Sequence, residues 1–244
     1  MATVGRWPRA IFYDSKTTLF DWAWSWRAAA EQIAAKYGGV DADAFFEDWV
    51  VLFEGFQRRA AFNRYADLTN HIREGLGYAY RVHGIRGEPE KDVQIYLDLQ
   101  QRVEPFPEVA GALQQQRALG VKILIFSDVE TRYIEMYVSK LGGFRPDFVG
   151  STEQARVHKP NARVYHWVLR QVGLEPRDVV YCAAPQFDVQ GALACGIKAA
   201  WLRRPQGRLG RKNATFEAGD VAADYEIEDL NQLTRILDAN LRPR

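Results

Sequence analysis

The chain has 244 residues, enough for one large domain or for a core with a second, smaller domain. Its composition is that of a soluble globular protein, and its net charge of +1 excludes a bulk attraction to nucleic acid or to a membrane surface. No apolar run is as long as a membrane span, the first residues lack the apolar segment of a secretion signal, and the only cysteines are Cys182 and Cys195. We therefore expect a cytoplasmic protein without a structural disulfide.

A short strand opens the chain, and a long helical stretch follows it. Residues 9–14 form an apolar run that ends at Asp14. Apolar residues then recur at helical spacing over 22–37, 42–62, 68–80 and 93–103. In the first of these segments we read Trp22, Trp24 and Trp26 as helix packing rather than as a substrate wall, although a spacing of two cannot place all three on one helix face.

Strands and helices alternate from residue 105 onward. The predicted helices are 108–118, 130–140, 161–172, 188–195 and 229–240, and the predicted strands are 121–126, a short one near Phe148, 178–182 and 197–202. Residues 205–218, rich in Gly and Arg, are the most loop-like stretch. Such alternation predicts an α/β fold with a Rossmann-like parallel sheet flanked by helices. Residues 1–19 and 105–244 would form this core domain, and residues 20–104 an inserted all-helical cap domain.

Polar side chains stand where the predicted strands end or where a helix begins. Asp14 and Ser127 follow strands, Lys159 precedes Pro160 at the start of a helix, and Asp188 follows the strand 178–182. Ligands of open α/β sheets bind at the carboxyl ends of the strands, so these positions predict a site. Taken singly, each has a plainer explanation: Asp14, Ser127 and Asp188 are common turn or helix-capping residues, and most lysines are exposed.

In their order along the chain, Asp14, Ser127, Lys159 and Asp188 resemble the four motifs of the haloacid dehalogenase-like hydrolase superfamily. The resemblance is strongest over 9–21 and 105–202. Phosphatases of that superfamily carry a second Asp two positions after the nucleophile and paired acids in the last motif, which hold Mg²⁺. Lys16 and Ala183 stand at those positions here. The sequence is more similar to the metal-independent branch, the L-2-haloacid dehalogenases.

This resemblance implies a reaction and a set of residues. Asp14 would displace halide from C2 of a small anionic substrate, an (S)-2-haloalkanoic acid, and form an ester that water then hydrolyses. Lys159 and Asp188 would be the other catalytic residues, and no metal or cofactor would be needed. The residues expected to contact the substrate are Ser15, Lys16, Thr18, Ser127, Asp128, Tyr165 and Phe187. Family members are often homodimers, but no interface can be read from this sequence, and no nucleic acid or membrane partner is expected.

The chain departs from the dehalogenase pattern at several positions. Lys16-Thr17 replaces a Tyr-Gly pair, Asp128 replaces an Asn that helps to hold the halide, and Phe187 replaces a Trp. Ala183 and Pro185 replace a Ser and an Asn, and the cap arginine that helps to cradle the halide has three candidates, Arg58, Arg59 and Arg64. Two alternatives therefore stay open: a phosphatase or other hydrolase of the superfamily with an altered site, and a non-catalytic binding protein.

Overall fold

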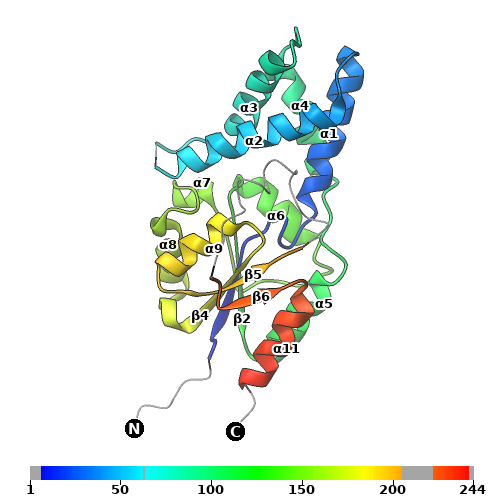
Figure 1. Ribbon diagram of the computed structural model, residues 1–244. Coiled ribbons are helices and arrows are strands. Elements are labelled where there is room, and N and C mark those ends of the chain that lie inside the picture. Colours follow the sequence, from blue (N-terminus) through cyan, green and yellow to red (C-terminus); the bar gives the residue numbers. More distant parts are fainter. Residues whose placement is uncertain (1–6, 63, 205–221, 242–244) are drawn as a thin grey trace, which may run out of the picture.

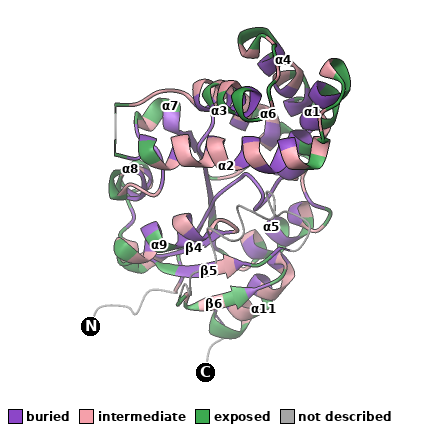
Figure 2. Ribbon diagram, turned by 45° about the horizontal axis from the view of Figure 1, so that its top comes forward, coloured by how far each residue is buried: buried purple, intermediate pink, exposed green. Residues whose placement is uncertain are grey.

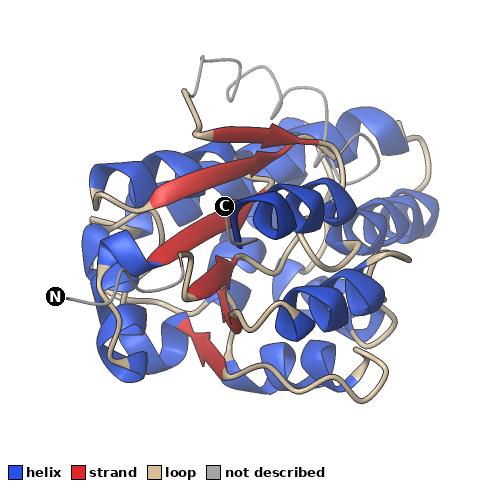
Figure 3. Cartoon of the chain, turned by 90° about the horizontal axis from the view of Figure 1, so that it is seen from below, coloured by secondary structure: helices blue, strands red, loops and turns tan. Residues whose placement is uncertain are grey.

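A six-stranded sheet forms the centre of the protein, of which the computed structural model describes residues 7–62, 64–204 and 222–241 (Figures 1 and 3). The N-terminal hexapeptide and the predicted loop 205–218 lie outside these ranges. All paired strands run parallel, in the order β3-β2-β1-β4-β5-β6. The strands are β1 (Ala10–Tyr13), β2 (Lys122–Ser127), β3 (Phe148–Ser151), β4 (Val179–Ala183), β5 (Lys198–Leu202) and β6 (Tyr225–Ile227).

The central strands are apolar on both faces because both faces of the sheet are covered by helices. Successive side chains of β1 alternate between the two faces: Ile11 packs in one hydrophobic cluster and Phe12 in the other. Figure 1 shows α5 and α11 over one face and α8 and α9 over the other. The helices of this core are α5 (Val109–Ala118), α6 (Thr131–Ser139), α7 (Thr152–Ala155), α8 (Ala162–Val172), α9 (Gln186–Ala194) and α11 (Leu230–Leu241), with a 3₁₀ turn at Pro176–Asp178.

Four helices form a separate layer above the carboxyl ends of the strands (Figure 1). They are α1 (Trp22–Tyr37), α2 (Ala42–Ala60), α3 (Leu68–Val82) and α4 (Pro89–Gln100). Buried aromatic rings hold them together: the Trp26 ring lies 4.6 Å from Trp49 and 4.8 Å from Tyr96, centroid to centroid. Trp22 and Trp26 are buried, whereas Trp24 is 38% exposed. Figure 2 shows buried and exposed stretches alternating along these helices, as in amphipathic helices. We interpret this layer as the cap domain 20–104.

The chain leaves the core and returns to it at two points that lie side by side. Asp21 N–H donates to the Glu104 carbonyl (2.9 Å), and Phe106 N–H donates to the Leu19 carbonyl (3.0 Å). Asp21 also caps α1, because its carboxylate accepts from Trp24 N–H. The helical layer is therefore anchored where α1 begins and where the segment after α4 re-enters the core.

The predicted α/β fold is confirmed, and some predicted element boundaries are wrong. Helix α4 begins at Pro89 rather than at residue 93, because proline is well suited to the first helical turn. Helix α9 begins at Gln186, so Asp188 lies in its first turn and not in the preceding loop. The short elements α7 and β6 were not predicted, since four and three residues are too few to show a periodic pattern.

Candidate active site

The four motif residues meet under the helical layer. Asp14 directly follows β1, Ser127 ends β2, and Asp188 follows β4 in the first turn of α9. Lys159 comes from the connection between α7 and α8. Because β2, β1 and β4 are neighbours in a parallel sheet, their carboxyl ends bring these side chains to one edge. All four residues are buried, so the site is closed to solvent.

Lys159 lies at the centre of the charged groups. Its Nζ is 2.5 Å from Asp14 Oδ1, also contacts Asp188 Oδ2, and lies 3.9 Å from Asp128 Oδ2. Burial opposes the charge, but the three carboxylates outweigh it and raise the pKa of Lys159 well above its ordinary value. Lys159 is 3% exposed, so the alternative of a surface lysine is wrong.

Both carboxylate oxygens of Asp14 have partners. Lys159 holds Oδ1, and the Thr18 hydroxyl donates to Oδ2 at 2.7 Å. The backbone N–H of Ala184 donates in turn to Thr18 Oγ1 at 2.9 Å. These contacts fix the orientation of the carboxylate, which a nucleophile requires.

The loop after Asp14 folds back on itself and brings Ser15 against Ser127 at the end of β2. The backbone N–H groups of Leu19 and Phe20 both donate to the Ser15 carbonyl. The Ser15 hydroxyl donates to Ser127 Oγ at 2.5 Å, and both side chains are fully buried. Ser127 therefore does not cap the following helix, whose first turn is preceded by Glu130.

Asp128 is an ionised carboxylate held by the core and by α2. It accepts from Lys159 N–H (3.2 Å) and from Gln57 Nε2 (3.1 Å), and it lies 3.8 Å from His158 Nδ1. Burial opposes its ionisation, but Lys159, His158 and Lys16 outweigh burial and lower the pKa of Asp128 to about 2. The position that holds an Asn in the dehalogenases thus adds a negative charge to this site.

Asp188 has the opposite balance of forces. Burial raises its pKa; the attraction of Lys159 opposes this, the charges of Asp14 and Asp128 reinforce it, and the pKa of Asp188 reaches about 7. Tyr181 donates to its Oδ2 at 3.1 Å. A carboxyl with such a pKa can exchange a proton near neutral pH, which suits a general base.

Tyr165 lies behind Asp188. It is fully buried, and its hydroxyl donates to the Asp188 backbone carbonyl at 2.8 Å. Gly191 on the next turn of α9 makes room for it, because a Cβ atom there would lie 2.5 Å from Tyr165 Oη. In this structure Tyr165 positions Asp188, and its predicted contact with substrate stays a prediction.

Helix α2 contributes to the site Glu54 and Gln57, which the sequence analysis did not assign, and Arg58, one of its three candidate arginines. Glu54, Gln57 and Arg58 follow one another at helical spacing and face the core. Gln57 donates to Asp128, and the Arg58 guanidinium lies 4.1 Å above the half-buried Phe187 ring and 3.4 Å from Glu54. Burial raises the pKa of Glu54. Their i, i+3, i+4 spacing places them on one face of α2, but no sequence pattern shows that this face covers the strand ends.

Of the three candidate arginines, Arg58 faces the motif residues. Arg59 is exposed, and its guanidinium lies 4.7 Å from the Phe56 ring. Arg64 is also exposed.

Lys16 is a second buried lysine, on the side of Asp14 that faces the helical layer. It is 7% exposed, and its Nζ lies 4.3 Å from the Trp22 ring centroid and 5.8 Å from that of Phe53. Burial lowers its pKa against the attraction of nearby carboxylates. The contacts with the two rings contribute about 0.5–2 kcal/mol, less than the several kcal/mol that burying an ammonium costs.

The side chains of this site do not favour the binding of a divalent cation. In residues 7–62, 64–204 and 222–241, no group of three His, Cys, Asp or Glu side chains is arranged to hold a metal ion. Lys16 and Ala183 stand where additional carboxylates would be needed, and a lysine beside the nucleophile repels a cation.

Among the helices of the described residues, none combines the length and the apolar character that a membrane span requires.

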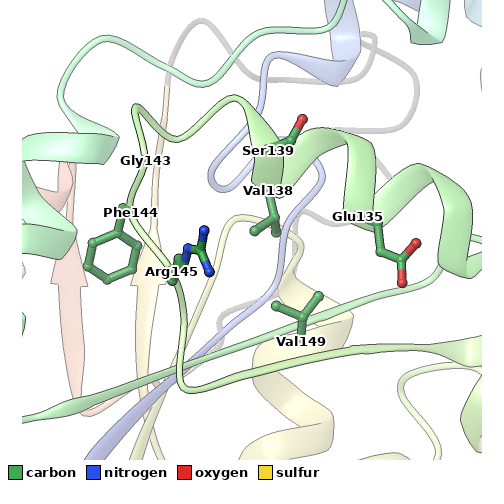
Figure 4. A pocket seen from close by; sticks show the side chains of 7 residues that line it. All are labelled: Glu135, Val138, Ser139, Gly143, Phe144, Arg145 and Val149. Atoms are coloured by element: carbon green, nitrogen blue, oxygen red, sulfur yellow. The ribbon is translucent and has the colours of Figure 1, made fainter.

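A surface pocket lies elsewhere, between α6 and β3 (Figure 4). Its lining is largely apolar and is formed by Glu135, Val138, Ser139, Gly143, Phe144, Arg145 and Val149. None of them is a predicted site residue. The chemistry of the strand ends therefore makes the buried cluster, and not this pocket, the candidate active site.

Comparisons with known proteins bear on the family and the fold of the chain. A sequence model of the haloacid dehalogenase-like hydrolases matches residues 11–202. The chain is 25% identical over 183 residues to the (S)-2-haloacid dehalogenase of Pseudomonas sp. (strain YL), covering 74% of this chain and 75% of that protein. It is 29% identical over 203 residues to the (S)-2-haloacid dehalogenase of Xanthobacter autotrophicus, covering 80% and 75%.

Solved structures show the same fold. The L-2-haloacid dehalogenase of Xanthobacter autotrophicus with covalently bound chloropropionic acid superposes with a TM-score of 0.77 at 23% identity, covering 94% of this chain and 98% of that one. A HAD-hydrolase of Bacillus subtilis bound to magnesium superposes with a TM-score of 0.78 at 13% identity, covering 95% and 99%. Fold similarity alone therefore does not separate the metal-dependent from the metal-independent members.

Proposed function

The chain belongs to the haloacid dehalogenase-like hydrolase family, and on that premise we propose that it removes halide from a small (S)-2-haloalkanoic acid without a metal ion. The observation that carries the proposal is the buried ion-pair cluster in which Lys159 Nζ contacts both Asp14 and Asp188. Two relatives named (S)-2-haloacid dehalogenases support it; they are 25% and 29% identical to the chain over 183 and 203 residues.

In the first step Asp14 acts as the nucleophile. A carboxylate oxygen attacks C2 of the substrate, the carbon–halogen bond breaks, and halide leaves with the bonding electron pair. The product is an ester between Asp14 and C2, whose configuration is inverted. Lys159 and Thr18 hold the carboxylate in the orientation that this attack needs.

In the second step water hydrolyses the ester. Asp188 accepts a proton from the water, which attacks Cγ of Asp14 and releases a 2-hydroxy acid. The carboxylate of Asp14 is restored and retains one oxygen atom from water. The raised pKa of Asp188 makes it basic enough to accept this proton near neutral pH.

Isotope labelling tests the ester. A single turnover in heavy-oxygen water should place the label in Asp14 rather than in the product, because water attacks the ester at Cγ. Direct labelling of the hydroxy acid would contradict the mechanism. Asp14→Asn should abolish turnover and leave the circular dichroism spectrum unchanged.

Substitution of Lys159 tests the cluster. Removing one charge-assisted contact of this kind reduces turnover by roughly two to three orders of magnitude, so we expect this loss for Lys159→Ala. Lys159→Arg should recover little, since a planar fork does not replace a point charge. Lys122→Ala, at an exposed lysine on β2, is the matched control and should be as active as the wild type. A near-normal rate for Lys159→Ala would contradict the assignment.

Metal dependence separates this proposal from a phosphatase. Exhaustive dialysis against EDTA should leave the rate on 2-chloropropionate unchanged, because the positions of the missing acids carry Lys16 and Ala183. Added Mg²⁺ should not produce turnover of p-nitrophenyl phosphate. A Mg²⁺ requirement, or phosphatase activity without dehalogenation, would favour the alternative branch of the family.

A further inference from the structure

We propose that the Lys16 ammonium donates hydrogen bonds to the departing halide, and that it makes 2-fluoro acids substrates of this enzyme. The inference rests on the proposed function, since it concerns the leaving group of that reaction. It begins from a buried cation in the active site, Lys16, for which the part of the chain that the structure describes offers no hydrogen-bond acceptor.

The ammonium of Lys16 has three donors and few partners. Within residues 7–62, 64–204 and 222–241, no hydrogen bond or ion pair joins Lys16 Nζ to a neighbouring side chain. Its nearest described neighbours are the Trp22 and Phe53 rings, which attract a cation but offer no oxygen acceptor. Lys16 is 93% buried, and a buried ammonium without hydrogen-bond acceptors among its described neighbours can bind an anion.

The other cations of the site are already occupied. Lys159 is bound between Asp14 and Asp188, and Arg58 is paired with Glu54. Displacement turns Asp14 into a neutral ester and creates a halide anion beside the buried carboxyl groups of Asp128 and Asp188, so a further positive charge must stabilise it. Lys16 is the cation of this site that lies two residues from the nucleophile.

The electrostatic surroundings favour an anion at Lys16 rather than a neutral amine. Burial lowers the pKa of Lys16, while Asp128, Glu54 and Asp14 raise it and Lys159 lowers it further. A halide anion beside Lys16 would raise its pKa, as the carboxylates do, and would keep the ammonium protonated. The displacement needs no proton transfer: the halide leaves with its electron pair and accepts a hydrogen bond from an ammonium that stays charged.

An ammonium donor distinguishes between halides. Lysine carries a compact point charge, and the attraction between two ions grows as their centres approach. Fluoride is the smallest halide and the strongest hydrogen-bond acceptor, so it gains most from this donor inside the aromatic walls. Fluoride is also the poorest leaving group, so carbon–fluorine cleavage depends most on such stabilisation.

The test is a leaving-group series. We would measure kcat/KM for (S)-2-fluoro-, 2-chloro- and 2-bromopropionate with the wild type, Lys16→Met and Lys16→Arg. Loss of the donor should reduce the rate on the fluoro acid by roughly 100-fold to 1000-fold and that on the bromo acid by no more than about 10-fold. Equal losses for all three halides would overturn the proposal, because Lys16 would then act on the fold or on Asp14.

The control is a second lysine that lies over a tryptophan. Lys198 Nζ is 4.8 Å from the Trp7 ring and is exposed on β5, so Lys198→Met should leave all three rates unchanged. Lys16→Met should also unfold at a higher temperature than the wild type, since it removes an unpaired buried charge. A lower unfolding temperature would indicate a structural role for Lys16 and contradict the proposal.

Anion binding is measured separately from turnover. Because the Trp22 ring lies against Lys16, iodide should quench tryptophan fluorescence saturably in the wild type and only linearly in Lys16→Met, at constant ionic strength. Saturable quenching in both proteins would overturn the anion site. If halide binds through Lys16 but none of the three acids is turned over, the anion site stands and the proposed dehalogenation fails.

Discussion

At the scale of single residues, the proposed mechanism makes hydrolysis of the ester depend on the proton on Asp188. Its pKa of about 7 belongs to a coupled cluster with Lys159, Asp14 and Asp128. Asp188 must be ionised to accept a proton from water, so we expect the single-turnover hydrolysis rate to rise about tenfold per pH unit below 7 and to level off above it. Rapid-quench measurement of the Asp14 ester between pH 5 and 9 checks this profile.

The control for this profile is a carboxylate outside the site. Asp188→Asn should hydrolyse the ester slowly at every pH, whereas Asp98→Asn, at an exposed position of α4, should keep the wild-type profile. A pH-independent wild-type rate would show that Asp188 is not the base.

The free energy of unfolding depends on pH in the opposite direction. The folded protein holds a proton on Asp188 that the unfolded chain releases above about pH 4. The stabilisation that comes from this proton is complete below pH 4 and is lost as the pH rises through 7.

Thr17 carries backbone strain. Its φ is 58°, in the left-handed region that costs a residue with a Cβ atom about 1 kcal/mol or more. Thr17→Gly should therefore be more stable than Thr17→Ala by about 1 kcal/mol in urea unfolding, since both variants lose the hydroxyl and only Ala keeps the strain. At the exposed Gln115 of α5 the order should reverse, with Ala more stable than Gly by about 1 kcal/mol.

The sequence predicted the motif residues better than their neighbours. Asp14, Lys159 and Asp188 could be found because each follows a strand or precedes a helix, and parallel strands bring their ends together. Glu54 could not be assigned, because its place in the site depends on how α2 docks over the core. Docking is set by the packing of many side chains, which a periodic pattern does not reveal.

At the scale of elements, the aromatic packing of α1 fixes the helical layer. Trp26 is fully buried among Trp49, Phe53 and Tyr96, while Trp24 on the same helix is exposed. Trp26→Ala should lower the free energy of unfolding by about 3–5 kcal/mol, through lost burial and a cavity.

Trp24→Ala is the matched control for Trp26→Ala and should change the free energy of unfolding by about 0.5 kcal/mol or less. Similar losses for both variants in chemical denaturation would contradict this account of the layer. The sequence predicted helix packing for these tryptophans, and the spacing of two residues explains why one of them faces solvent.

At the scale of the whole molecule, the core also contacts the helical layer on the side away from the two points where the chain leaves and re-enters the core. Glu130 of the core accepts hydrogen bonds from the backbone N–H and the hydroxyl of Thr69 in the first turn of α3. His158 contacts the Ala66 carbonyl at 2.7 Å, and Asn161 donates to the Ala61 carbonyl at 2.7 Å. These contacts hold the layer over the closed site.

Removing the contact at Glu130 should loosen this side of the layer. Glu130→Ala leaves the Thr69 N–H without its partner, so we expect its hydrogen exchange to become about tenfold faster, equivalent to about 1.4 kcal/mol. Glu153→Ala is the control: Glu153 accepts in the same way from Thr131 N–H at 2.9 Å, but within the core. Exchange at Thr69 should be unchanged in that variant, and unchanged exchange in Glu130→Ala would show that the contact does not hold α3.

The two points where the chain leaves and re-enters the core lie side by side, and this affects how such a protein can change in evolution. Because Leu19 and Phe106 are hydrogen-bonded neighbours, as are Asp21 and Glu104, the core is nearly continuous without the segment between them. A different segment can be inserted at this point with little cost in loop closure and without a new core, since insertions are tolerated where the chain ends already meet. Exchange of this one segment would place a different set of side chains over Asp14, and the proposed site could then accept different substrates.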